Sequence, residues 1–189
     1  MKQLQSSFVN MLLVLSVISL ISAGLLAATF EYTKDDIAAN QLAKQMAALD
    51  AVLPQYDNDL LADEIRVDGF SLFPAYQGGE LVGAAVLGIT EQAFSGEMQV
   101  MAGFSPDGTL INSIAVRHAE TPGLGSKVND DGFAGQFRSL ILEPGQVLEV
   151  SKDGGAIDAV TAATISSRAY CDAVSLAWKS AASFFGGAQ

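Results

Sequence analysis

The fold class is decided by residues 97–116, which read EMQVMAGFSPDGTLINSIAV. Both ends of this stretch alternate with a period of two, as half-buried strands do. Ser105–Gly108 lies between them and places Pro and Gly where a turn requires them. The stretch therefore predicts an antiparallel hairpin in which two groups of residues each share one strand face: Met98, Val100, Ala102 and Phe104, then Leu110, Asn112, Ile114 and Val116.

The residues before the hairpin predict two more strands. Phe70–Ala75 is apolar, and Pro74 within it is typical of an edge strand because proline donates no ladder hydrogen bond. Leu81–Thr90 is also apolar, and its two glycines indicate close backbone contacts. Gln77–Glu80, which contains two glycines, is expected to be the turn between these strands.

The residues after the hairpin predict one further strand and a final helix. Gln146–Lys152 has the composition of a strand. From Thr164 onward, apolar residues recur at the 3.6-residue spacing of an amphipathic helix. We therefore expect an α+β fold, in which residues 65–189 form a single domain with an antiparallel sheet flanked by helices.

The N-terminal segment carries no charge from Phe8 to Phe30. A helix of that length extends roughly 34 Å and can cross the ~30 Å hydrocarbon core of a bilayer. A cleaved signal peptide is the alternative, but its apolar run is shorter, at about 7–15 residues. We expect a short tail and a transmembrane helix over residues 1–31.

The orientation of this span is weakly encoded, because Lys2 and Lys34 place one basic residue on each flank. The short tail and the large C-terminal part favour a cytoplasmic N-terminus. The chain is then a single-pass protein of the cytoplasmic (inner) membrane, with its C-terminal domain on the outer, periplasmic side.

Residues 32–64 predict an amphipathic helix that continues out of the membrane and then a connector. Pro54 ends the helical pattern because it cannot donate to the helix ladder. The helix is either a stalk or packs its apolar face on the domain behind it. The width of its apolar stripe favours packing.

The charge and the cysteine count exclude several classes of function. The formal charge is −11, and from Glu31 onward 21 acidic residues stand against nine basic ones. This balance argues against a nucleic-acid partner, which requires clustered Lys and Arg. The single cysteine excludes an internal disulfide and an iron–sulfur cluster ligated only by cysteines of this chain. The single histidine argues against a multi-histidine zinc site. Any redox chemistry must therefore be carried by an organic cofactor.

Three short segments are candidates for such a site. Arg117–Lys127 follows the hairpin, and its proline and glycines suit either close approach of a flat ligand or an ordinary loop capped by His118. Gln92–Glu97 precedes the hairpin and contains Phe94. Phe94 either forms a wall beside a bound ring or lies in the core, and its residue type alone favours the core. Asp158–Thr164 contains small and hydroxyl residues at the start of the final helix, where a simple helix cap is the alternative.

Taken together, these segments resemble a known family. Asp158–Thr164 has the form Asp-x-x-Thr-x-Ala-Thr, the flavinylation motif of membrane electron-transport subunits. It follows, in the expected order, an apolar N-terminal span, the Phe-Ser-Gly-Glu of residues 94–97 and the Glu-Thr-Pro-Gly-Leu-Gly of residues 120–125. Over essentially its whole length the chain resembles the G subunits of Rnf-type ion-translocating ferredoxin:NAD oxidoreductases. The C subunits of sodium-pumping NADH:quinone oxidoreductases share the domain, but the shorter length favours the Rnf family.

The resemblance implies FMN attached through a phosphoester to Thr164, installed from FAD by a separate flavin transferase. It places Glu120, Thr121, Leu124 and Gly125 along the flavin and Phe94 and Ser95 near its ring or ribityl chain. It assigns Asp158, Thr161 and Ala163 to the attachment motif, where they orient the threonine or serve recognition. The family usually has glycine where this chain has Ala162, and a positive φ there would disfavour alanine.

The function that the resemblance implies is electron transfer, with no catalytic residue and no metal site of the chain's own. The partners are other membrane subunits of the same complex. The sequence contains no Gly-x-Gly-x-x-Gly nicotinamide motif, which fits a relay. A membrane-tethered flavin reductase and a scaffold module without flavin are the alternatives from other classes. The residues leave open whether Arg117, Lys127 or Arg168 lies near the flavin.

Overall fold

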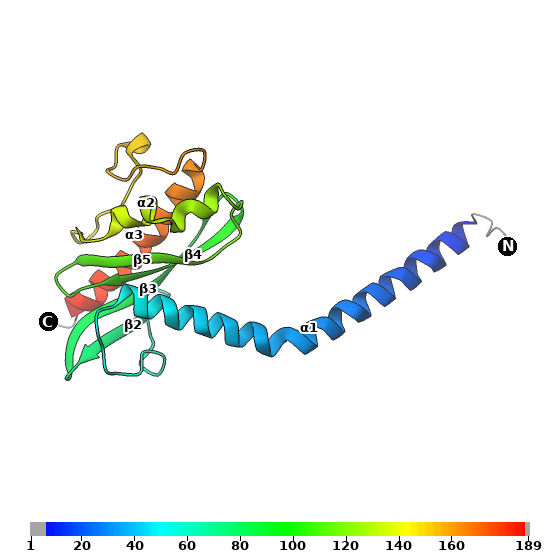
Figure 1. Cartoon of the computed structure of the whole chain (residues 1–189), viewed down its shortest axis with the longest axis horizontal. Coiled ribbons are helices and arrows are strands. Elements are labelled where there is room, and N and C mark those ends of the chain that lie inside the picture. Colours follow the sequence, from blue (N-terminus) through cyan, green and yellow to red (C-terminus); the bar gives the residue numbers. More distant parts are fainter. Residues whose placement is uncertain (1–6, 188–189) are drawn as a thin grey trace. The chain divides into compact units, whose positions relative to one another are not determined.

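The computed structural model describes residues 7–187, and the chain divides into two compact units, residues 1–43 and 44–189 (Figure 1). Among the described residues, the first unit is the part of helix α1 (Phe8–Val52) up to Ala43, and the last turns of α1 belong to the second unit. The predicted span lies wholly within α1, and its apolar side chains are exposed, as a lipid-facing helix requires. The orientation prediction rests partly on Lys2, which lies outside the described residues. The helix is continuous past residue 31, and the three-part division 1–31, 32–64 and 65–189 stays a prediction.

The second unit is built on an antiparallel sheet whose strands follow one another in chain order, so that each strand pairs with the next. This confirms the predicted α+β class. Within residues 7–187 the sheet has six strands: β1 (Ile65–Val67), β2 (Phe70–Gln77), β3 (Glu80–Ala93), β4 (Gly96–Phe104), β5 (Thr109–His118) and β6 (Leu140–Ile141).

The two faces of the sheet are covered by different helices (Figure 1). Helix α3 (Thr164–Gly187) packs on one face, where the predicted residues Met98, Val100, Ala102 and Phe104 of β4 contribute to the core. The last turns of α1 pack on the other face against Met101. The α3 contact is close because a Cβ added at Gly88 of β3 would lie 2.0 Å from the Ala173 carbonyl oxygen. The sheet is therefore buried on both sides.

The predicted hairpin is present, but β5 does not have one continuous face. β4 and β5 pair from Phe104 with Leu110 to Met98 with His118. Bulges in β5, the first at Ile111, shift the register, and a bulge reverses which face the following side chains occupy. Leu110 therefore packs with α3, whereas Ile114 and Val116 pack on the opposite face. The prediction that these residues share one face is wrong for this reason.

The predicted strand Gln146–Lys152 is also wrong. The segment contains only an isolated bridge from Val150 to Ile157 and the 3-10 helix η3 (Ser151–Asp153). In place of a strand partner, the Leu148 N–H donates to the side chain of Ser175 on α3, at 2.8 Å from its Oγ. Three short elements lie between β5 and β6: η1 (Gly125–Asn129), α2 (Asp131–Ala134) and η2 (Gly135–Phe137).

The predicted packing of the helix before Pro54 is confirmed at its C-terminal end. Leu49 and Val52 are fully buried, whereas Ile37 and Leu42 are exposed. The connector then covers the part of β2 that extends beyond the short strand β1. There Asn58 donates to the Pro74 carbonyl at 3.0 Å and accepts from the Tyr76 N–H at 2.9 Å. The edge strand is therefore β1 rather than β2, and Pro74 lies in the part of β2 beyond the residues that pair with β1.

Candidate functional site

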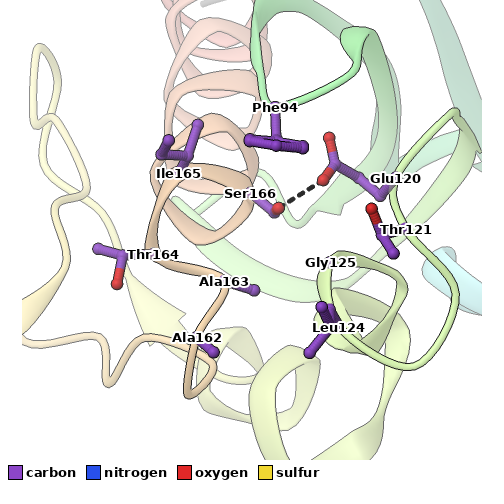
Figure 2. Close-up of a pocket in the computed structure, with 10 residues that line it drawn as sticks. All are labelled: Phe94, Glu120, Thr121, Leu124, Gly125, Ala162, Ala163, Thr164, Ile165 and Ser166. Carbon is purple, nitrogen blue, oxygen red and sulfur yellow. Dashed lines mark hydrogen bonds between the residues drawn. The ribbon is translucent and has the colours of Figure 1, made fainter.

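A cavity of about 340 Å³ lies where three segments meet (Figure 2). These are the turn between β3 and β4, the loop after β5, and the start of α3. The volume lies within the ~300–1,000 Å³ range of small-molecule sites. The residues that line it are Phe94, Glu120, Thr121, Leu124, Gly125, Ala162, Ala163, Thr164, Ile165 and Ser166.

Glu120 ties the three segments together. Its side chain is buried, with 6% of the residue exposed. One carboxylate oxygen accepts from Ser166 Oγ at 2.6 Å (Figure 2). The other accepts from the Ser95 N–H at 3.1 Å. A buried carboxylate is tolerated because both oxygens have donors. The Glu120 N–H in turn donates to His118 Nδ1 at 3.3 Å, so His118 does cap this loop.

Gly125 closes the loop against the helix. A Cβ at this buried position would lie 2.3 Å from Glu120 Oε2 and 2.6 Å from Ser166 Oγ. The loop folds back on itself through the Thr121 carbonyl, which accepts from the Leu124 and Ser126 N–H groups at 3.2 and 3.3 Å. Any side chain at residue 125 would therefore push apart the groups that Glu120 holds together.

A tight turn leads into α3. The Ala163 N–H donates to the Val160 carbonyl at 3.0 Å, and Ala162 in the third position has φ +64°. A turn with positive φ there normally takes glycine. The glycine expected from the family resemblance thus corresponds to a real constraint, and this chain places an alanine in the left-handed region at a cost of roughly 1–2 kcal/mol.

Thr164 is the first residue of α3, and its hydroxyl faces a cation. The first hydrogen bond of the helix runs from the Ser167 N–H to the Ala163 carbonyl at 3.0 Å, so the amides of residues 164–166 lie in the turn where a helix leaves its donors unpaired. Lys152 Nζ donates to Thr164 Oγ1 at 3.1 Å. The Thr164 hydroxyl thus lies in a positive local field.

The loop that carries Lys152 is tied to the same helix by an ion pair. Arg168 Nε and Nη2 donate to the two carboxylate oxygens of Asp153 at 2.6 and 2.7 Å. Hydrogen bonding from the guanidinium lowers the pKa of Asp153, and the carboxylate raises the pKa of Arg168. Arg168 is therefore engaged with Asp153, and the pair fixes the residue next to Lys152.

Three apolar side chains stand exposed around the cavity. Phe94, Leu124 and Ile165 are 66%, 47% and 47% exposed. The alternative that places Phe94 in the core is therefore wrong. Phe94 lies in the turn between β3 and β4 and lines the cavity together with the first turn of α3, outside the buried core. The cavity is open and apolar at its rim, as a flat aromatic ligand requires.

The structure brings most of the predicted site residues together. Ser95 contributes its backbone N–H to Glu120, whereas Asp158 and Thr161 are exposed and are not among the residues that line the cavity. The predicted residues in the lining are Phe94, Glu120, Thr121, Leu124, Gly125, Ala163 and Thr164.

None of the three candidate cations lies in the lining of this cavity. Arg117 pairs with Glu97 at 3.6 Å, Arg168 pairs with Asp153, and Lys127 is exposed on η1. No sequence pattern pointed to Lys152, because it lies 12 residues before Thr164 in a segment predicted as a strand. Ser166 was missed as well, although a hydroxyl two residues after the motif is visible in the sequence.

Comparison with known proteins identifies the family. Residues 94–179 match an FMN-binding domain, and residues 11–52 match the RnfG N-terminal region. The G subunit of the ion-translocating oxidoreductase complex of Methanosarcina acetivorans is 35% identical over 164 residues, which cover 84% of this chain and 86% of that protein. The G subunit of the same kind of complex from Cereibacter sphaeroides is 36% identical over 171 residues, covering 83% of this chain and 76% of that protein.

The chain belongs to the family of G subunits of ion-translocating oxidoreductase complexes.

The fold of this chain is shared with two solved structures. NqrC from Shewanella oneidensis has a TM-score of 0.53 and 21% identity, covering 76% of this chain and 72% of that one. The C subunit of the Na⁺-translocating NADH-quinone reductase from Parabacteroides distasonis has a TM-score of 0.54 and 15% identity, covering 76% of this chain and 83% of that one. At these identities the likeness establishes the fold.

Proposed function

We propose that this protein carries FMN as a phosphoester on Thr164 and relays electrons within an ion-translocating oxidoreductase complex of the membrane. One observation carries the attachment site. Of the two motif threonines, Thr164 lines the cavity and begins α3, whereas Thr161 is exposed outside the lining. The matched FMN-binding domain and the relatives from ion-translocating complexes support the cofactor and the complex.

The start of α3 suits the phosphate of such an attachment. A phosphodiester keeps one negative charge, and the N-terminus of a helix stabilises an anion by about 0.3–1 kcal/mol through its unpaired N–H groups and dipole. Thr164 places its oxygen at that position, with Lys152 beside it. The attachment point therefore offers both hydrogen-bond donors and a compensating charge.

The cavity suits the ring system. The exposed apolar side chains of Phe94, Leu124 and Ile165 supply contact area for a flat ring, and Glu120 fixes the segments that carry them. When bound, FMN supplies reversible electron transfer. The open rim leaves one edge of a bound ring accessible to neighbouring subunits, which is what a relay needs and a closed substrate pocket would prevent.

The proposed assembly follows from α1 and the relatives. α1 fixes the chain in the membrane as a single span, and the domain lies on the outer side when the N-terminus is cytoplasmic. The direct partners are membrane subunits of the same complex, and a separate flavin transferase acts on the exposed turn before α3. Membership in the family of sodium-pumping C subunits has only fold likeness in its favour, at 21% and 15% identity.

Two threonine variants test the attachment site. Thr164→Val and Thr161→Val are matched, because each replaces one motif hydroxyl by a methyl group. We expect Thr161→Val to keep flavin fluorescence on a denaturing gel and Thr164→Val to lose it while the chain stays folded. Flavin that survives denaturation in Thr164→Val contradicts the proposal. A wild-type chain without bound flavin supports the scaffold alternative instead.

A further inference from the structure

Lys152 occupies a position that the family motif does not include. Its ammonium nitrogen lies 3.1 Å from Thr164 Oγ1, and both groups are accessible from solvent. Lys152 belongs to η3, whereas Thr164 begins α3, so the contact joins two segments 12 residues apart. No cation lies among the residues that line the cavity itself.

We propose that Lys152 acts directly on the flavin-accepting hydroxyl. Its ammonium group holds the Thr164 oxygen in position for attachment and then neutralises the phosphate that this oxygen bears. The inference rests on the proposed attachment of FMN to Thr164, and it adds the chain's own contribution to that reaction.

The position of Lys152 is fixed by contacts on both sides of it. On one side, Val150 is buried and bridges to Ile157, and the Ser151 N–H donates to the Ile157 carbonyl at 2.7 Å. On the other side, Asp153 forms its two-pronged ion pair with Arg168. Residues four apart lie on the same face of a helix, so Arg168 holds η3 beside the face from which Thr164 projects.

The reaction conserves atoms and needs no redox step. FAD, the flavin donor, consists of FMN and AMP joined through one phosphoanhydride bond. The Thr164 oxygen bonds to the phosphorus on the FMN side, the bond from that phosphorus to the AMP phosphate oxygen breaks, AMP leaves, and the hydroxyl proton is released. Lys152 donates a hydrogen bond to the attacking oxygen, which favours its negative character as the proton departs. The product has one negative charge beside one ammonium ion.

The alternative is an ordinary surface contact, and the two roles predict different measurements. An exposed hydrogen bond of this kind contributes little to stability. A purely structural Lys152 would therefore leave both unfolding and flavin attachment unchanged when it is replaced. A lysine that only docks the transferase would alter the KM for the chain rather than kcat.

The test measures flavin transfer to the full-length chain in detergent. The apo chain is purified from cells lacking the transferase and mixed with purified flavin transferase and FAD, and the product is quantified by intact mass. Lys152→Met keeps an unbranched side chain that is one atom shorter, and it removes the charge. Lys152→Arg restores the charge. Lys179→Met is the matched control, because it removes one exposed lysine from α3 away from the cavity.

We expect Lys152→Met to lower kcat for transfer by about tenfold, in keeping with loss of one charged hydrogen bond. The KM for the chain and the midpoint of thermal unfolding stay at their wild-type values. Lys152→Arg recovers most of the rate, and Lys179→Met matches wild type. A wild-type kcat in Lys152→Met overturns the inference, and so does a change confined to KM. A wild-type chain that accepts no flavin at all overturns the proposed function itself.

Discussion

The two segments that face each other across the cavity are built in opposite ways. The loop Glu120–Gly125 is held by a buried carboxylate with two donors and by a glycine that leaves no room for a side chain. The turn Val160–Ala163 has two exposed residues at its centre, Thr161 and Ala162, and carries a positive φ on an alanine. One side of the site is fixed by burial, and the other is accessible and strained.

The difference fits two separate requirements. The loop and the start of α3 must keep their spacing so that the cavity persists, and Glu120 provides this by bonding to Ser166 in the helix. The turn must stay accessible, because the proposed modification is made there by another protein. Substitutions in the loop should therefore change stability strongly, whereas substitutions in the turn should change it little or even improve it.

The largest effect is expected for Gly125→Ala. The added Cβ would displace the Glu120 carboxylate from both of its donors, so overpacking and lost hydrogen bonds add to about 3 kcal/mol. Chemical unfolding of the full-length chain in detergent measures this loss. Gly132→Ala is the control, since a Cβ at Gly132 meets nothing within 4 Å. Equal stability of the two variants would show that the loop is not tightly packed.

A smaller loss is expected for Glu120→Gln. The amide preserves the shape of the side chain, but its NH₂ group cannot accept a hydrogen bond, and the charge on the acceptor disappears. We expect about 1–2 kcal/mol of destabilisation in the same unfolding assay. Glu91→Gln, at an exposed position on β3, should change nothing measurable. If Glu120→Gln unfolds like wild type, Glu120 does not hold the three segments together.

Ala162→Gly is expected to stabilise the chain. Glycine adopts φ +64° without a Cβ penalty, and the gain is about 1 kcal/mol after its larger unfolded-state entropy is subtracted. The matched control is Ala156→Gly, an exposed alanine whose φ is not positive, and glycine there should be neutral or destabilising. The comparison is made by thermal unfolding, and a lower midpoint for Ala162→Gly would argue against strain in the turn.

The smallest effect is expected for Asp158→Asn. The Asp158 residue is exposed, and its backbone N–H and carbonyl, rather than its carboxylate, bond to Gln136. Stability should change by less than about 0.5 kcal/mol. A loss of stability comparable to that of Glu120→Gln would mean that the segment leading into the turn is as firmly held as the loop.

Sequence patterns predicted the regular elements well, because period and turn chemistry are local. The hairpin turn at Ser105–Gly108 and the buried face of α3 were both visible in the sequence. The bulge at Ile111 was not, since one extra residue leaves the alternation intact on each side of it. The segment around Lys152 has the composition of a strand and was predicted as one. It is not a strand, because its hydrogen bonds go to a side chain and to its own turn.

The site was predicted only in part, because a motif identifies residues but not what surrounds them. The glycine expected at position 162 correctly signalled a positive φ there. By contrast, the role of Ser166 in holding Glu120 and the contact of Lys152 with Thr164 depend on how distant segments fold together. Residue type alone favoured the core for Phe94, and only the family resemblance placed it near the flavin; its exposure could not be read from the sequence.

The most direct test of flavin attachment is intact-mass measurement of the chain purified from membranes of cells that contain the transferase. We predict a gain in mass equal to FMN minus one water. Cleavage after Lys152 and Arg168 releases a single peptide, residues 153–168, that contains both motif threonines. Fragmentation of this peptide should place the added mass on Thr164. An unmodified chain, or flavin on Thr161, would contradict attachment at Thr164.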